Sequence, residues 1–502
     1  MKNCRIRIHL TGICAWVLAA IVLPSSPIVG GEDIKPKLNF IFFIVDDLGW
    51  ADLSSSGSTF HETPFIDGLA EDGLTLSRAY AAAPRCTPSR TSILTGKLHA
   101  RPGVLDENGL NAEQVTLAEA FKQNGYRTFF AGKWHIGKSA EAYPEAHGFD
   151  VNKGGCFWGQ PGGPLTKYGN EAGGGFYFSP YGCPTLEEGP EGEYITDRLT
   201  DETISFIKDH SKNHPAKPFL AYLSHYGVHT PYEAKQEDIE YFRNKLEKLD
   251  KTDGPDYITD GTGKVKMKQD HVVYAAMVKA VDDSMGKLRK ELKRMGLADN
   301  TAIIFTSDNG GLSTTAANGN RNLATSNYPL RTGKGWLYEG GIREPTIVFW
   351  PGVTPQGKQT DRPVVNMDFY PTMLDMAGCE QLPDEHIDGS SFKKLLQGDF
   401  DLPREPIYFY YAMAKIGTGN PSMAVMMDMD WKLVQNLYAG TFELYNLKQD
   451  IGEQNDLLTK FPERANKMKK ALLDWQKEAK MPPLSKTNIE ENQALYEKAG
   501  LK

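Results

Sequence analysis

The sequence predicts an α/β fold: a large, mostly parallel central sheet sandwiched by helices, plus a smaller C-terminal domain with an antiparallel sheet and a packed helix. Three observations lead to this prediction. A chain of 502 residues is too long for one ordinary domain and suits a large domain with a smaller appendage. Residues 38–45 are almost continuously apolar, as in a central strand covered on both faces. Residues 274–295 repeat apolar side chains every three or four positions, as in a helix packed on a sheet.

The first thirty residues are typical of a secretory signal peptide. Lys2, Arg5 and Arg7 precede an apolar run over residues 13–23, which is short for a membrane span. We therefore expect residues 1–30 to be removed and the protein to be exported, either to the periplasm or to the medium. A retained anchor is the alternative. No later stretch reaches membrane-spanning length, so we expect no membrane span in the mature chain.

The charge of the mature chain argues against nucleic acid as a partner. Residues 1–30 contain three basic and no acidic residues, so their removal changes the net charge from −8 to −11. An acidic surface repels anionic polymers at long range. Any anionic substrate must therefore be held by a local cluster of basic side chains and metal.

The elements of the large domain are predicted from caps, apolar periodicity and short apolar runs. Helices are expected over residues 64–73, 116–125, 195–210 and 274–295, and further strands over residues 74–76, 126–131, 218–224, 302–307 and 346–350. Residues 233–270 are charged and poor in aliphatic side chains, so we expect a mobile insertion or an irregular helix there.

Two predicted strands end in oxygen ligands. Asp46 and Asp47 follow residues 38–45, and Asp308 and Asn309 follow the strand that ends at residue 307. Open α/β sheets bind ligands at the carboxyl ends of their strands; taken alone, the first pair could equally be a solvated turn. Hard oxygen donors suit Ca²⁺ or Mg²⁺ rather than Zn²⁺, and three gathered carboxylates need a cation between them.

Cys86 stands at the start of a predicted helix. Pro88 fits the first helical turn, so the free N–H groups of that turn and the helix dipole favour a negative charge at residue 86. Arg90 adds a cation one turn further on. A structural thiol or half of a disulfide is the alternative for this cysteine.

Other strands also end in polar residues. Lys133 and His135 follow the strand over residues 126–131, and His225 and His229 follow the strand over residues 218–224. A solvated charge is the alternative for Lys133, and a packed ring is the alternative for His135.

A Gly-rich stretch over residues 154–192 has no periodicity, which predicts a long functional loop that walls a pocket. Cys156 and Cys183 bracket it and could pair in an oxidising compartment, while Cys379 fits a small buried site. Beyond the large domain, residues 407–410, 431–434 and 443–447 predict strands of a small antiparallel sheet, and residues 462–480 predict a helix packed on it.

Three motifs carry a resemblance to one family. Residues 86–90 resemble the Cys-x-Pro-x-Arg signature of type I, formylglycine-dependent sulfatases, which are arylsulfatase-like members of the alkaline phosphatase superfamily. Residues 125–135 resemble the family's second signature, and residues 330–345 resemble a further block. The resemblance covers nearly all of the mature chain. It implies a catalytic domain over residues 33–390 and a C-terminal subdomain over residues 391–502.

The resemblance implies two cofactor features. Cys86 would be oxidised to the aldehyde formylglycine by a formylglycine-generating maturation enzyme during export. One Ca²⁺, in preference to Mg²⁺, would be bound by formylglycine and by the residues that match the family's metal ligands, Asp46, Asp47, Asp308 and Asn309.

The resemblance also implies the reaction, hydrolysis of a sulfate monoester. Hydrated formylglycine would attack sulfur with help from Asp308, and Arg90 and His135 would hold the diol. Lys133 and Lys334 would bind the sulfate, which His135 also contacts. His229 would protonate the leaving oxygen, whereas the competing His225 would orient its loop.

The expected substrate is a sulfated sugar or oligosaccharide, read by residues 154–192, 318–328 and 411–423. A phosphomonoester or phosphonate hydrolase of the same superfamily is one alternative, but such enzymes commonly carry histidine where this chain has Asn309. A non-catalytic glycan-binding relative is the other, but the expected loss of Cys86 or of the metal carboxylates is not seen.

Overall fold

The strand β1 (Asn39–Val45) lies inside the main sheet of the computed structural model, which describes residues 37–162, 176–249 and 253–501. In this part of the chain eight strands form one sheet in the order β15-β2-β14-β11-β1-β8-β6-β7. The other seven are β2 (Leu74–Leu76), β6 (Arg127–Gly132), β7 (Val151–Lys153), β8 (Phe219–Ser224), β11 (Thr301–Ser307), β14 (Ile347–Phe349) and β15 (Lys358–Thr360). Strands β11, β1, β8, β6 and β7 run parallel, and β14 runs antiparallel to both neighbours. The predicted mostly parallel sheet is confirmed.

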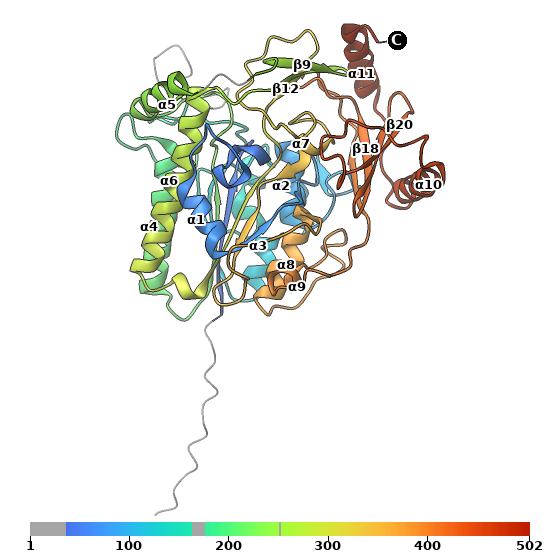
Figure 1. The fold of residues 1–502 in the computed structure, drawn as a ribbon. Coiled ribbons are helices and arrows are strands. Elements are labelled where there is room, and N and C mark those ends of the chain that lie inside the picture. Colours follow the sequence, from blue (N-terminus) through green and yellow to red (C-terminus); the bar gives the residue numbers. More distant parts are fainter. Residues whose placement is uncertain (1–36, 163–175, 250–252, 502) are drawn as a thin grey trace, which may run out of the picture. The chain divides into compact units, whose positions relative to one another are not determined.

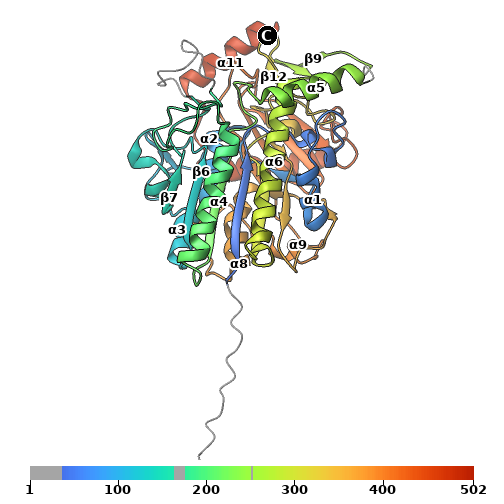
Figure 2. The ribbon, with the colours of Figure 1, turned by 90° about the vertical axis from the view of Figure 1, so that its left-hand side faces the viewer.

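Helices cover both faces of this sheet (Figure 1). Ile41, Phe43 and Val45 of β1 pack in one buried cluster with α1 (Pro64–Asp72), α4 (Ile195–Asn213) and α6 (Val272–Arg294). The alternate side chains of β1 pack in a second cluster with α2 (Cys86–Thr95), α3 (Leu117–Gln123) and α8 (Phe369–Met376). In Figure 2 α4 and α6 flank β1 on the near face. Burial on both faces explains why β1 is apolar at every position after Asn39, since each buried large side chain contributes about 1.5–3 kcal/mol.

The prediction for residues 233–270 was wrong. This segment contains α5 (Gln236–Lys248) and the strands β9 (Tyr257–Asp260) and β10 (Gly263–Lys266), which pair in a small sheet with β12 (Thr314–Ala316). Phe242 anchors α5 by an edge contact with Phe60, with ring centroids 5.7 Å apart. Both partners, Phe60 and β12, lie outside the segment, so its own composition gave no sign of them.

The C-terminal part carries a four-stranded antiparallel sheet of β17 (Ile407–Tyr411), β18 (Met423–Asp428), β19 (Trp431–Asn436) and β20 (Phe442–Asn446). The helix α10 (Pro462–Glu478) packs on it, and Trp475 stacks on Tyr408 with ring centroids 4.7 Å apart. The predicted sheet and helix are confirmed. Strand β18 and a last helix, α11 (Lys486–Ala499), were not predicted.

Short elements complete the described fold: β3 (Ala79–Tyr80), β4 (Leu105–Asp106), β5 (Gly109–Leu110), β13 (Arg343–Glu344), β16 (Val364–Val365), α7 (Glu339–Ile342) and α9 (Lys393–Leu396). Lys37–Lys502 packs as one unit. The boundary between residues 33–390 and 391–502 stays a prediction, and the predicted signal peptide, residues 1–30, lies outside the described residues. Among the helices that the structure describes, none is both long and apolar enough to cross a membrane.

Candidate active site

The site forms where two neighbouring parallel strands end. Val45 of β1 lies opposite Ser307 of β11, so the residues that follow the two strands emerge side by side. The backbone N–H of Asp47 donates to Asp308 Oδ1 at 3.1 Å, and Asn309 Nδ2 donates to Asp47 Oδ1 at 2.8 Å. Asp47 has a φ of 62°, a left-handed conformation that Asp adopts more readily than most residues. The structure thus brings together the carboxylates and the amide that the sequence singled out, Asp46 included, and all are buried.

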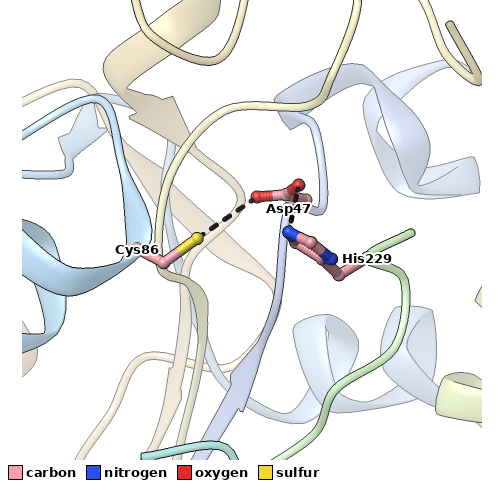
Figure 3. A group of neighbouring side chains, drawn as sticks. All are labelled: Asp47, Cys86 and His229. Atoms are coloured by element: carbon pink, nitrogen blue, oxygen red, sulfur yellow. Dashed lines mark hydrogen bonds and ion pairs between the residues drawn. The ribbon is translucent and has the colours of Figure 1, made fainter. Parts of the chain in front are cut away.

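Cys86 is the first residue of α2 and faces these carboxylates. Its Sγ lies 3.8 Å from Asp47 Oδ1, and on the other side of Asp47 stands His229 (Figure 3). Burial raises the pKa of the thiol to about 12. Lys133 and Lys334 oppose this shift, and the negative charges of Asp46 and Asp308 add to it. At neutral pH the unmodified thiol is therefore protonated and a poor nucleophile.

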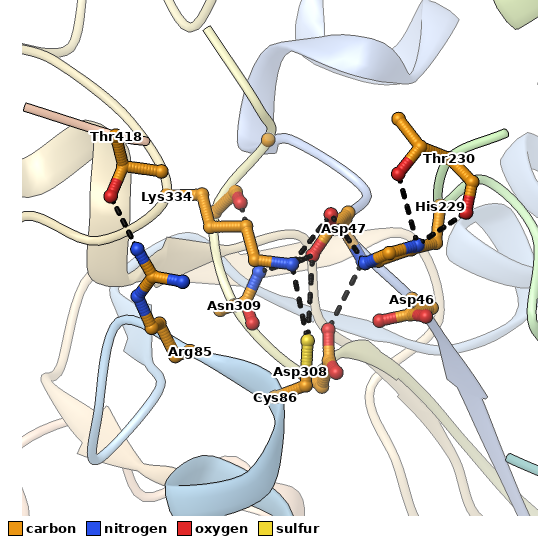
Figure 4. A network of polar contacts seen from close by, with 12 residues as sticks. Asp46, Asp47, Arg85, Cys86, His229, Thr230, Asp308, Asn309, Lys334 and Thr418 are labelled. Atoms are coloured by element: carbon orange, nitrogen blue, oxygen red, sulfur yellow. Dashed lines mark hydrogen bonds and ion pairs between the residues drawn. The ribbon is translucent and has the colours of Figure 1, made fainter. Parts of the chain in front are cut away.

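Two buried ammonium groups neutralise the carboxylates, and Figure 4 shows one of them, that of Lys334, beside Asp47 and Cys86. Lys133 Nζ lies 2.5 Å from Asp46 Oδ2. Lys334 Nζ lies 2.5 and 2.7 Å from the two oxygens of Asp47 and donates to Cys86 Sγ at 3.1 Å. Burial alone would raise the pKa of Asp47, but Lys334, His229 and Lys133 together hold it well below its usual range. Asp47 is therefore ionised at neutral pH.

Arg90 joins the ends of several strands. Its Nε donates to Asp308 Oδ2 at 2.9 Å, and its Nη1 donates to the Lys133 carbonyl at 2.9 Å and to Ser224 Oγ at 2.6 Å. Its Nη2 lies 3.6 Å from Asp46 Oδ1. Burial, reinforced by Asp46 and opposed by Arg90, raises the pKa of Asp308 to about 6.

The three candidate histidines have different surroundings. His229 Nε2 lies 3.8 Å from Asp47 Oδ2, and its Nδ1 lies 2.6 Å from the Thr230 carbonyl, which fixes the ring. Burial, aided by the lysines, lowers the pKa of His229 to about 3, so the ring is neutral. His225 instead contacts Ser284 of α6 through Nε2 at 3.0 Å.

His135 supports the nucleophile through its backbone. Its carbonyl accepts a hydrogen bond from Thr87 Oγ1 at 2.9 Å, next to Cys86, and its φ is 61°. The residue is half-buried, and its buried Nδ1 has no hydrogen-bond partner among the described residues. Burial, with the charges of Lys133 and Arg90, lowers its pKa well below the usual value. The predicted contact between this ring and the reacting groups stays a prediction.

The residues fit a hard divalent cation. Ligand atoms of Asp46, Asp47, Cys86 and Asp308 lie within 4.8 Å of one another. Asp46 Oδ1 and Asn309 Oδ1 are buried and accept no hydrogen bond from the residues described. Buried oxygen atoms rarely lack partners, so two such atoms beside three carboxylates match the donor set for Ca²⁺ or Mg²⁺.

Three residues at this site were missed by the sequence analysis. Ser224 contacts Arg90 and ends β8, so its place before His225 was the available signal. The Tyr274 hydroxyl lies 3.3 Å from the Asp47 carbonyl oxygen and 2.6 Å from Asp52 Oδ2. Its position in the apolar stripe of α6 had indicated only a role in the hydrophobic core. Arg85 precedes Cys86 and carried no motif of its own.

Two family models match the chain. The model described as "Sulfatase" matches residues 38–379, and the model described as "N-sulphoglucosamine sulphohydrolase, C-terminal" matches residues 332–478. The first covers more than half of the chain and includes the whole cluster of acidic and basic residues around Cys86.

Individual relatives agree. Steryl-sulfatase of Mus musculus is 30% identical over 484 residues, which cover 81% of this chain and 72% of that protein. A sulfatase of Formosa agariphila is 30% identical over 530 residues, covering 88% and 89%. The solved structure of Ps i-CgsB in complex with k-i-k-neocarrahexaose superposes with a TM-score of 0.70 at 28% identity, covering 92% of this chain and 98% of that one. The chain therefore belongs to the sulfatase family, sulfuric ester hydrolases with the alkaline phosphatase superfamily fold.

Proposed function

We propose that this sulfatase is an exported enzyme that hydrolyses a sulfate monoester of a carbohydrate, with formylglycine at position 86 and one bound Ca²⁺. The observation that carries the proposal is the contact of Lys334 Nζ with both Cys86 Sγ and Asp47, because it joins the nucleophile position to the carboxylate cluster. The relatives include a steryl-sulfatase and a structure with a neocarrahexaose, so the carbohydrate is the part that most needs testing.

The unmodified thiol of Cys86 would be a poor nucleophile. With a pKa near 12 the thiol offers almost no thiolate at neutral pH. Formylglycine in its hydrated form would supply one hydroxyl to attack sulfur and a second whose deprotonation expels sulfate. The conversion requires a formylglycine-generating maturation enzyme in the host.

The carboxylate cluster would hold the cation through Asp46, Asp47, Asp308 and Asn309. When bound, the cation would supply positive charge beside the sulfate oxygens and lower the pKa of a neighbouring hydroxyl. Lys133 and Lys334 now pair with Asp46 and Asp47. A cation on these carboxylates would weaken both ion pairs, and the two ammonium groups could then bind the sulfate oxygens.

Three further side chains would position the reacting groups. The hydrogen bond from His229 Nδ1 to the Thr230 carbonyl leaves Nε2 directed toward Asp47 and Cys86 (Figure 3). A bound sulfate would raise the pKa of this ring, so that Nε2–H could give its proton to the leaving oxygen. Arg90 is held in place by Asp308 and Ser224. Together with His135 it would hold the nucleophile.

Sulfate release from defined sulfated mono- and disaccharides would test the proposal. The series would contain galactose, N-acetylhexosamine, fucose and uronate, with protein co-produced with a formylglycine-generating enzyme and sulfate measured by ion chromatography. We expect release from one sugar with a preference for one position. Phosphate and phosphonate esters run in parallel, because their cleavage in place of sulfate esters would favour the related hydrolases.

The Cys86→Ala variant is the matched control. We expect no sulfate release but an unchanged circular dichroism spectrum and urea midpoint, since the substitution removes one sulfur atom from a small buried site. Full activity of this variant would exclude the mechanism.

A further inference from the structure

Two arginines that contact the turn at residues 417 and 418 have no acidic partner among the described residues. Arg85 immediately precedes Cys86, and its guanidinium donates to Thr418 Oγ1 (Figure 4). Arg321 Nη1 donates to the neighbouring Gly417 carbonyl at 3.4 Å. In the described part of the chain neither guanidinium forms an ion pair with a carboxylate, and Arg85 Nε is buried without a hydrogen-bond partner. Two positive charges therefore converge on one turn without being neutralised.

Two tyrosine hydroxyls in the same region also lack partners. Tyr411 ends β17 and is only 1% exposed, yet its hydroxyl has no hydrogen bond among the described residues, and neither does the buried hydroxyl of Tyr232. Burial raises the pKa of the Tyr411 hydroxyl, and the charged or titratable groups of Arg85, Cys86 and Lys334 contribute smaller shifts. A buried hydroxyl without a hydrogen bond destabilises the fold, so its retention points to a ligand.

The hydroxyl of Tyr232 has similar surroundings. Burial is the main cause that raises its pKa, and the charges of Asp47, Arg321 and Lys334 contribute smaller shifts. Contacts place each tyrosine near one of the two arginines. The rings of Tyr232 and His271 lie 4.9 Å apart between centroids, and His271 Nε2 lies 3.3 Å from Asn322 Nδ2, next to Arg321. Asn420 accepts a hydrogen bond from the Thr418 hydroxyl and donates one to the carbonyl of Met413, two residues after Tyr411. These unused donors, Arg85, Arg321 and the hydroxyls of Tyr411 and Tyr232, are called the rim.

We propose that Arg85 and Arg321, together with the hydroxyls of Tyr411 and Tyr232, bind a second anionic group of the substrate, a carboxylate or a second sulfate on the sugar that carries the scissile ester or on its neighbour. This inference rests on the proposed sulfatase reaction. Lys133 and Lys334 serve the scissile sulfate, so a further anion needs further cations. A planar guanidinium binds carboxylate and sulfate through paired N–H groups, and a local cluster is required because the chain is acidic overall.

The test compares kcat/KM for three matched substrates: a sulfated sugar with a neutral neighbour, with a uronate neighbour, and with a second sulfate. We expect the wild type to favour at least one charged substrate by about tenfold or more, mainly through KM, because a hydrogen bond to a charged group contributes that much. The better of the two charged substrates identifies the anion as carboxylate or sulfate.

Three variants assign the preference to this rim. Arg321→Gln alters an exposed side chain, and Tyr411→Phe removes only a hydroxyl, so both should fold; Arg85→Gln should have the largest effect. Each should lower the ratio of charged to neutral substrate toward one. Arg294→Gln, which changes an exposed arginine at the end of α6, should leave the ratio unchanged.

The outcomes separate the two proposals. Sulfate release from all three substrates with equal kcat/KM would overturn the second-anion site and leave the sulfatase reaction standing. A preference that persists in all three rim variants would also overturn it. Absence of release from every substrate, with aldehyde at residue 86 verified by mass spectrometry, would overturn the proposed function and this inference with it.

Discussion

At the scale of single residues, the unpartnered oxygen atoms are the most informative feature. Asp46 Oδ1 and Asn309 Oδ1 are buried beside three carboxylates and accept no hydrogen bond in the part of the chain described. A bound cation would satisfy both atoms and relieve the repulsion between the carboxylates. Metal should therefore stabilise the fold as well as support turnover.

Calcium should raise the melting temperature of chelator-treated protein. A ligand present at a hundred times its dissociation constant stabilises the native state by about 2.7 kcal/mol. We expect Asn309→Ala to reduce this gain strongly, since it removes one of the two unpartnered oxygens. Differential scanning calorimetry at several Ca²⁺ and Mg²⁺ concentrations measures the effect.

A matched control is Asn213→Ala, which changes an exposed asparagine at the end of α4. This variant should keep the full response to calcium. An equal response in Asn309→Ala would show that residue 309 does not bind the ion, and a larger gain with Mg²⁺ than with Ca²⁺ would contradict the proposed choice of metal.

Residues of this site could be predicted from the sequence only where their immediate neighbours in the chain marked them. Asp46, Asp47, Asp308 and Asn309 follow buried strands directly, and parallel strands end at one edge, so their convergence could be predicted. The contact of Arg85 with Thr418 joins segments more than three hundred residues apart. Nothing in the local pattern indicates such a pair.

At the scale of elements, one helix is capped by another. The carboxylate of Asp282 on α6 accepts hydrogen bonds from the backbone N–H groups of Phe65 and Ile66, the latter at 2.8 Å, at the start of α1. Thr63, the residue at the cap position, accepts no hydrogen bond from the backbone N–H groups of the helix. Burial raises the pKa of Asp282 to about 7, and the two backbone N–H groups only partly oppose it.

This raised pKa predicts a pH dependence of stability. The unfolded state releases the Asp282 proton near pH 4, whereas the folded state retains it until about pH 7. Stability from this group is therefore complete below pH 4 and decreases as the pH rises to 7, by an amount on the order of 4 kcal/mol. Asp282→Asn keeps an acceptor oxygen and cannot ionise, so it should flatten this decrease.

Urea unfolding of wild type and Asp282→Asn between pH 5 and 8 measures the difference. Asp201→Asn is a suitable control, because Asp201 lies on the neighbouring helix α4 and pairs with Lys287 at the surface. Parallel pH profiles for wild type and Asp282→Asn would show that Asp282 keeps an ordinary pKa.

Elements with strong local patterns could be predicted, and those that depend on distant partners could not. Strand β1 and helix α6 were predicted from their apolar pattern alone. Strand β18 contains three methionines, which have little preference for strands, and it is buried because β17 and β19 pair with it. Helix α11 buries only Asn492 and Leu495, too few for a recognisable stripe.

At the scale of the whole described unit, buried charges join the C-terminal sheet to the catalytic core. Lys432 of β19 lies 2.9 Å from both Glu339 of α7 and Glu453. Glu339 also accepts a hydrogen bond from the Tyr80 hydroxyl at 3.0 Å and pairs with Arg343 at 3.3 Å. This network connects β3, α7 and β19, so the C-terminal sheet and the catalytic core should unfold together.

Loss of the central ammonium should therefore destabilise the whole unit. Lys432 is fully buried, and Lys432→Met leaves two buried carboxylates without their cation, which costs about 3–5 kcal/mol. We expect one cooperative urea transition at a lower midpoint, with tryptophan fluorescence and activity lost together. Lys467→Met, at an exposed position of α10, should leave the midpoint unchanged. The double variant Lys432→Met/Glu453→Gln should recover part of the loss, because it removes one of the stranded charges. Two separate transitions in Lys432→Met would instead mean that the C-terminal sheet unfolds as an independent domain.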